Sequence, residues 1–147
     1  MTLKKIQIEN VGQIKSADIE FGDLTVLVGP QATGKSIFLQ LLRLVVDTGH
    51  VHDEMRKHGL DWKRAVPDFL GVYLGEGMES LWKQGESGSS VTLDGKKTDF
   101  VEYVTRRHRS TEPQLFYIPA QRVLTLANGW PRPFSGYGAG DPFAVRD

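Results

Sequence analysis

The sequence predicts an α/β fold in which an N-terminal antiparallel hairpin leads into a buried strand, a glycine-rich loop and a helix. Residues 3–9 and 14–21 alternate apolar and polar side chains, as half-buried strands do, and turn-forming residues separate them. Residues 24–28 are apolar almost throughout, which is typical of a strand covered on both faces. The pattern G-x-x-x-x-G-K-S follows at 29–36, and an apolar segment with helical periodicity begins at Ile37.

The helix after this loop is predicted from Gly34 to Asp47. Its apolar residues recur at helical spacing. They form one inner stripe, Phe38, Leu41, Leu42 and Val45. Gly49 and the run His50–His52 are expected to end the helix, because glycine commonly follows the last helical turn.

Shorter elements are expected beyond residue 60. Asp61 is predicted to cap a short helix that runs to Leu70 and is interrupted near Pro67, and residues 72–83 are predicted to continue helically. After a loop at 85–90, an Asp-Gly turn predicts a small hairpin. The hairpin, the next helix and a buried strand are expected at 91–97, 99–109 and 115–118.

The last twenty residues have a different composition. Residues 128–147 are rich in glycine, proline and aromatic side chains and show no periodicity, so a loop or partly disordered tail is expected there. Residues 1–127 are predicted to form the N-terminal lobe of a larger domain. On this interpretation the domain is incomplete at Asp147.

Size and charge set broad limits on the function. A chain of 147 residues can bury one core, and its net charge of zero gives no global field that indicates a nucleic-acid or acidic-membrane partner. The absence of cysteine excludes disulfides and thiolate metal sites, and it suits a reducing cytoplasm. No apolar run is long enough to span a bilayer, so we expect a cytoplasmic protein.

The glycine-rich loop predicts a nucleotide-phosphate site with Mg²⁺. Glycines let the backbone turn inward so that several N–H groups point at one anion, and the helix start adds a partial positive charge. Lys35 is positioned to reach the β- and γ-phosphates, and the Ser36 hydroxyl is a ligand for Mg²⁺. The predicted nucleotide-binding residues are Gly29, Pro30, Gln31, Ala32, Thr33, Gly34, Lys35, Ser36 and Ile37.

Four stretches resemble parts of ABC-type ATPase heads: the first three resemble the start of the head, and the last resembles the strand and turn that follow its first lobe. They are IQIENVGQI at 6–14, ADIEF at 17–21, GPQATGKS at 29–36 and, later, FYIPAQR at 116–122. The most similar heads are those of chromosome-maintenance and recombination-repair ATPases, overcoming-lysogenization-defect nucleases and related AAA-labelled defence ATPases. The chain departs from many relatives at Gln31-Ala32, where they carry Asn-Gly.

The resemblance implies a site and a reaction. In such heads a glutamine at a strand end senses Mg²⁺ and the γ-phosphate, which implies Gln121 as a nucleotide and metal ligand beside Arg122, with Ser36 as the other metal ligand. The family hydrolyses ATP in a head-to-head dimer, using a signature sequence and a strand that ends in Asp-Glu. Neither motif is recognisable in these 147 residues. We therefore expect this lobe to bind Mg-ATP or ADP without turnover, to form a homodimer through its nucleotide face in the full-length form, and to meet DNA only through the longer parent.

Four other stretches resemble nucleotide motifs less well. Leu44–Asp47 has the lettering of a strand that ends in a magnesium-binding aspartate, but it falls on the helix after the loop. Residues 134–138 resemble the signature faintly, without a helix start behind them. Residues 68–71 and 96–99 resemble two GTPase motifs, but the first lacks a preceding strand and the second lacks the base-reading asparagine.

Other side chains have a structural and a functional interpretation. His50 and His52 would share a face of an extended chain as a metal pair does, but a solvated loop is expected because no third ligand is recognisable nearby. The run 106–109 is expected to be a solvated basic helix end, with DNA phosphate contact as the alternative. The tail aromatics are expected to pack against another part of the domain or a partner, with base stacking as the alternative. These aromatics are Trp130, Phe134, Tyr137 and Phe143.

Two functions stay open at this point. One is the ATP-binding lobe of an ABC- or AAA-type ATPase whose full-length form couples hydrolysis to nucleic-acid maintenance or defence. The other is a nucleotide-binding regulatory module that does not hydrolyse. A reading frame that continues past Asp147 into a signature and an Asp-Glu strand would distinguish them. A small-molecule kinase would need an arginine-bearing lid, for which residues 106–109 are a poor substitute.

Overall fold

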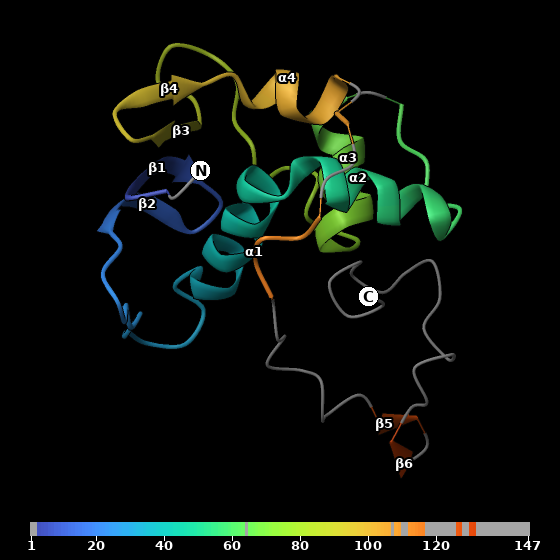
Figure 1. Cartoon of the computed structure of the whole chain (residues 1–147), viewed down its shortest axis with the longest axis horizontal. Coiled ribbons are helices and arrows are strands. Elements are labelled where there is room, and N and C mark those ends of the chain that lie inside the picture. Colours follow the sequence, from blue (N-terminus) through green and yellow to red (C-terminus); the bar gives the residue numbers. More distant parts are fainter. Residues whose placement is uncertain are drawn as a thin grey trace.

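The computed structural model describes residues 3–63, 65–106, 108–109 and 112–116, together with the backbone of 126–127 and 130–131. An antiparallel four-stranded sheet lies beside a group of helices (Figure 1). The strand order is β2-β1-β3-β4. The strands are β1 (Lys5–Val11), β2 (Ile14–Glu20), β3 (Ser90–Leu93) and β4 (Lys96–Thr98). A separate pair, β5 (Leu126–Ala127) and β6 (Trp130–Pro131), is also antiparallel.

Both predicted hairpins are confirmed. Ile8 of β1 lies opposite Ala17 of β2, as the alternation of apolar residues requires. The turn between β3 and β4 uses Asp94 at φ 47° and Gly95 at φ 78°, the left-handed pair that a two-residue hairpin turn needs. The carboxylate of Asp94 also accepts the backbone N–H of Lys5 at 2.8 Å, which ties this hairpin to β1.

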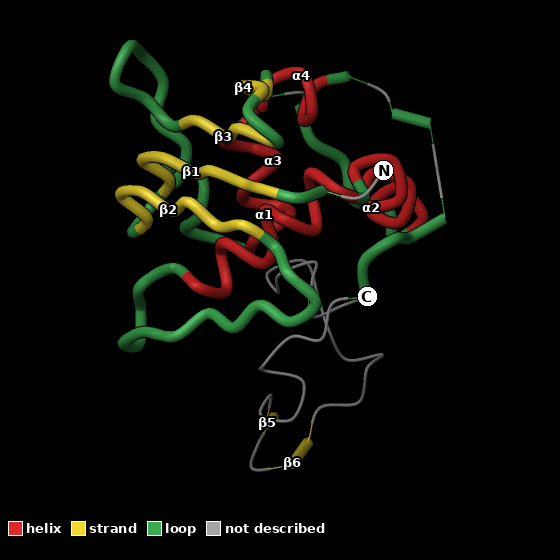
Figure 2. Tube along the Cα trace, turned by 60° about the vertical axis from the view of Figure 1, so that its left-hand side comes forward, coloured by secondary structure: helices red, strands yellow, loops and turns green. Residues whose placement is uncertain are grey.

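Helix α1 (Lys35–Val46) packs against one face of the sheet, as the two views show (Figures 1 and 2). Its predicted start and end agree with the structure to within one residue. The shared core contains fully buried residues of the sheet and of α1. They include Ile6, Ile8, Val91, Leu41 and Leu44. The sequence therefore placed this layer correctly, except that Leu42 is only partly buried and Leu44 lies in the core instead.

The predicted end of this helical region at Gly49 is wrong. The chain bends at Asp47 and continues as α2 (Thr48–Lys57), which contains Gly49, His50 and His52. The bend is stabilised because the Thr48 hydroxyl donates to the Leu44 carbonyl at 2.6 Å. A glycine inside a helix costs about 1 kcal/mol relative to alanine, and the burial of Val51, His52 and Met55 outweighs that cost.

Helix α3 (Val66–Leu74) begins later than predicted. Pro67 lies in its first turn, where its missing N–H has no helical partner to lose, so it starts the helix and does not interrupt it. Asp61 is not the N-cap, because the helix begins at Val66 with Ala65 as its N-cap; the Asp61 carboxylate accepts the neighbouring Trp62 N–H at 2.9 Å. The helix ends at Leu74, with Gly75 as its C-cap. Residues 75–83 are non-helical, so the predicted helical continuation beyond Leu74 is wrong.

Helix α4 (Phe100–Thr105) is shorter than the predicted 99–109, and Asp99 caps it by accepting the Glu102 N–H at 3.2 Å. Of the predicted strand at 115–118, residues 115–116 belong to no strand and the other two lie outside the described residues. Gln121, Arg122 and most of the predicted tail 128–147 also lie outside them. None of the helices in the described part of the chain has the length and apolarity that a bilayer crossing needs.

Residues 24–28 do not form the predicted strand. The segment has no assigned secondary structure, and among the described residues no strand pairs with it. Leu24, Val26 and Val28 are 84%, 67% and 89% exposed, while Leu27 packs against the core. The apolar pattern is that of a strand covered on both faces, and here only one side is covered.

We expect this exposed row to drive self-association at high protein concentration. Unpaired backbone groups beside exposed apolar side chains favour edge-to-edge pairing. The double substitution Leu24→Lys/Val26→Lys should abolish concentration-dependent sedimentation, with a stability change within about 0.5 kcal/mol, the usual range for surface positions. Leu39→Lys is the control, since Leu39 is an exposed apolar residue on α1. Equal self-association of the double variant and the wild type would contradict this expectation.

Candidate functional site

The predicted phosphate loop leads directly into α1. Residues 31–34 form turns, and helical geometry begins at Lys35. Gly34 precedes the helix at φ 89°, in the left-handed region, and no side chain caps the first turn. The N–H groups at the start of α1 therefore have no side-chain acceptor, which is the arrangement that attracts an anion.

Close packing also demands a glycine at position 34. A Cβ atom added there would lie 2.6 Å from Cγ1 of Ile14, which is well inside van der Waals contact. Ile14 opens β2 and is buried. The hairpin thus packs against the loop through Ile14. Both the left-handed backbone angle and the contact with Ile14 disfavour a side chain at position 34.

A hollow of about 260 Å³ opens beside the helix start. It is lined by Gln31, Ala32, Thr33, Gly34, Lys35, Ser36 and Ile37, together with Gln13. Seven of the nine consecutive residues predicted for the site therefore surround one space. Gly29 and Pro30 lie just before it in the loop, and the predicted Gln121 is outside the described residues.

The Lys35 ammonium group folds back onto its own loop. Its Nζ atom donates to the carbonyl of Gly29 at 2.8 Å, the carbonyl of Pro30 at 2.5 Å and the hydroxyl of Thr33 at 3.2 Å. The Thr33 hydroxyl in turn donates to the Pro30 carbonyl at 3.0 Å. These bonds hold the positive charge over the loop.

Gln13 is a lining residue that sequence reasoning did not select. It lies in the turn between β1 and β2, and its side chain is exposed. A second segment fixes this turn, because the Gly12 N–H donates to the Leu81 carbonyl at 3.0 Å and Val11 bridges to Trp82. Only the turn chemistry of residues 10–13 was visible in the sequence, and it gave no sign of the contact at 81–82.

Asp47 has a structural role. Leu44–Asp47 is helical at its first three positions, so the prediction that this stretch falls on the helix is confirmed. Asp47 is 1% exposed, and its carboxylate accepts the N–H groups of Gln114 at 2.9 Å and Leu115 at 2.8 Å. Both oxygens are therefore engaged by the backbone of a distant segment, which leaves Asp47 unsuited to a metal.

The prediction of a solvated histidine loop is wrong. His52 is completely buried on α2, with ring centroids at 4.9 Å from Trp62, 5.5 Å from Phe69 and 5.4 Å from His108. Burial, followed by the charges of His108 and Arg56, lowers the pKa of His52 to about 4. Among the described residues no three histidine or acidic side chains gather as a metal site.

The basic run at 106–109 is only partly described. Arg106 follows the end of α4 and pairs with Glu102 one turn earlier. Residue 107 lies outside the described residues, as do the side chains of the tail aromatics. The alternatives of DNA contact and base stacking are not decided by these residues.

Comparison with known proteins gives the family. The AAA ATPase domain matches residues 1–104. A putative ribosomal RNA large subunit methyltransferase of Methanocaldococcus jannaschii is 33% identical over 72 residues, which are 48% of this chain and 18% of that protein. The chain thus spans less than a fifth of that relative, and no solved structure matches. With a mixed α/β fold and a match over more than two thirds of its length, the chain belongs to the AAA ATPase domain family, whose members bind nucleotide.

Proposed function

We propose that the loop 29–36 binds the phosphates of ATP together with Mg²⁺. The observation that carries this proposal is the uncapped start of α1 at Lys35, which opens onto the hollow in a chain of the AAA ATPase domain family. Free N–H groups and the positive end of a 12-residue helix favour an anion at this point. Ser36 is exposed at the helix start, where its hydroxyl is available to Mg²⁺.

Lys35 is the cation that would bind the phosphates. Its ammonium group donates to two loop carbonyls, which are neutral acceptors. A phosphate oxygen carries charge and accepts a hydrogen bond roughly twice as strong. We therefore propose that Lys35 leaves the carbonyls of Gly29 and Pro30 when nucleotide binds and moves to the β- and γ-phosphates.

The hollow favours binding without hydrolysis by this chain alone. Its lining side chains are amides, hydroxyls, small or apolar groups and one lysine, with no carboxylate among the described residues. Hydrolysis needs a group that orients the attacking water. We propose that the longer parent supplies it and that Gln121 completes the metal site. In this proposal the parent is an ABC-type ATPase that forms a dimer and acts in nucleic-acid maintenance or defence, and a non-hydrolysing regulatory module is the alternative.

Nucleotide binding by the chain tests the proposal. Isothermal titration with ADP and Mg²⁺ should give saturable one-site binding, and Lys35→Ala should weaken it at least about tenfold through the loss of a charge-assisted bond. Lys83→Ala is a matched control, because Lys83 is exposed and lies outside the hollow. Ser36→Ala should remove the gain in affinity that Mg²⁺ provides. Equal affinities of the Lys35→Ala variant and the wild type would contradict the proposal.

Phosphate release separates the two functional alternatives. The 147-residue chain should release no phosphate from ATP above the level of Lys35→Ala. A parent that contains this segment should hydrolyse ATP if the first alternative holds, and it should bind without turnover if the regulatory module is correct. Steady hydrolysis by the short chain, lost in Lys35→Ala, would overturn the assignment of this chain as a binding lobe.

A further inference from the structure

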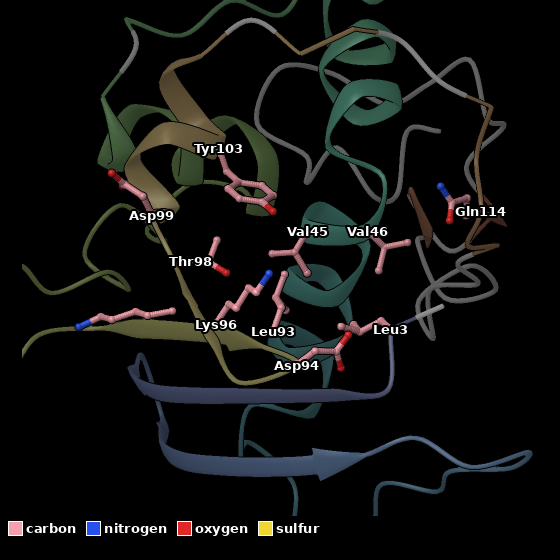
Figure 3. A pocket seen from close by; sticks show the side chains of 11 residues that line it. Leu3, Val45, Val46, Leu93, Asp94, Lys96, Thr98, Asp99, Tyr103 and Gln114 are labelled. Atoms are coloured by element: carbon pink, nitrogen blue, oxygen red, sulfur yellow. The ribbon is translucent and has the colours of Figure 1, made fainter. Parts of the chain in front are cut away.

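We propose that a second cavity, at the opposite end of α1 from the phosphate loop, binds a small organic anion with an apolar body, such as an aromatic carboxylate. The cavity lies between the end of α1, the β3–β4 hairpin and α4 (Figure 3). This inference concerns a different site and does not rest on the proposed nucleotide function.

The cavity has the size and walls of a small-molecule site. Its volume is about 440 Å³, within the range of about 300–1,000 Å³ that is usual for such sites. The walls are mainly apolar and come from the N-terminal segment, α1, β3 and α4. They comprise Leu3, Val45, Val46, Leu93 and the ring of Tyr103. Such walls favour a flat or branched apolar group.

Polar groups enter this space from one side of β4. Lys96 and Thr98 lie two residues apart on the strand and therefore share a face. In Figure 3 the Lys96 ammonium group extends between Thr98 and Val45, and the Tyr103 hydroxyl points toward Val45. The Lys96 ammonium group and two hydroxyls thus gather where a ligand's polar end would lie, and Lys97 is a second lysine of the lining.

The two acidic residues at the cavity, Asp94 and Asp99, bond to backbone donors and not to Lys96. Asp94 accepts the backbone N–H groups of Lys4 at 3.0 Å and Lys5 at 2.8 Å, and Asp99 accepts the N–H of Glu102. Both carboxylates are therefore held by backbone donors. Within the described part of the chain Lys96 forms no ion pair, so an anionic ligand gives it a partner.

The cavity is separate from the phosphate loop. Val45 and Val46 end α1, whereas Lys35 begins it. At 1.5 Å per residue the 12-residue helix is about 18 Å long. One small ligand cannot reach both ends, and no residue lines both the cavity and the hollow.

Titration with 2-naphthoate, followed by two-dimensional NMR of the full chain, tests this site. Saturable shifts are expected at Val46, Leu93, Thr98 and Tyr103. Lys96→Gln should weaken binding about tenfold, because a charge-assisted contact is lost. Lys15→Gln should change it less than twofold, because Lys15 is an exposed lysine on β2 that does not line the cavity. The neutral probe 2-naphthylmethanol should bind the wild type about as weakly as the carboxylate binds Lys96→Gln.

Three results would overturn the proposal. They are shifts that do not saturate or that gather on residues 24–28, equal binding of the two probes, and equal losses in Lys96→Gln and Lys15→Gln. Val46→Phe supplies an independent check, because a larger side chain at this partly buried position fills the cavity and should abolish binding. A folded Val46→Phe variant that binds 2-naphthoate normally would also overturn it.

Discussion

Gly34→Ala is expected to lower the free energy of unfolding by about 3 kcal/mol, the sum of a left-handed backbone penalty and a steric clash. Gly34 has φ 89°, and a Cβ atom there would lie 2.6 Å from Cγ1 and 3.3 Å from Cδ1 of Ile14. Ile14 is buried against the core, so it has little freedom to move away. Urea denaturation of the variant and the wild type measures the difference.

Gly95→Ala is the matched control for this prediction. Gly95 also has a left-handed φ, 78°, but a Cβ atom there would meet nothing within 4 Å. Its substitution should cost only the backbone penalty of about 1–2 kcal/mol. The excess loss in Gly34→Ala then measures the contact between the loop and β2. If the two variants lose the same free energy of unfolding, the expectation that Gly34 packs closely against Ile14 is wrong.

The same substitution also bears on the proposed nucleotide site. A shift of the loop away from Ile14 would turn the N–H groups at the start of α1 away from the hollow. Gly34→Ala should therefore weaken ADP binding even at temperatures where the variant is folded, whereas Gly95→Ala should bind as the wild type does. The two measurements separate a loss of fold from a loss of the loop's geometry.

The sequence predicted those elements whose signals are local. Alternating residues and a turn were enough for the β1–β2 hairpin, and Asp94-Gly95 was enough for the β3–β4 turn. The candidate loop 29–37 is contiguous, so its residues could be named in advance. Whether they bind nucleotide stays a prediction.

The failures come from contacts between distant segments. No local pattern shows that β3 pairs with β1, where Ile8 lies opposite Val91, or that Gln13 reaches the hollow because Leu81 holds the preceding turn. Helix α2 passes through Gly49 because several of its residues are buried, among them His52, which packs against Trp62 and against Phe69 of α3. Tertiary burial outweighed helix propensity at this position.

Residues 24–28 show a different limit. Their composition describes a strand with neighbours on both sides, and the described residues contain no such neighbours. The apolar pattern indicates how far the segment would be buried if strands or helices lay on both sides of it. The pattern does not indicate which residues would bury the segment.

The stability of the chain is expected to fall by up to about 3 kcal/mol as the pH falls from 6.5 to 4, because of His52. The pKa of His52 is about 4 in the folded protein, whereas the ordinary value of 6.5 applies to the unfolded chain. Between these values the unfolded chain binds a proton at His52 and the folded chain does not, so protons favour unfolding. The groups that surround the ring are Trp62, Phe69, His108 and Arg56, none of which is an anion.

Urea denaturation at several pH values checks this expectation. His52→Leu should remove most of the slope between pH 6.5 and 4, and His50→Leu, at a partly exposed position on the same helix, should keep it. Asp18 adds its own dependence at lower pH, because its hydrogen bond with Lys5 holds its pKa below the ordinary value. A wild-type slope that His52→Leu leaves intact would show that the aromatic cluster does not keep this histidine neutral.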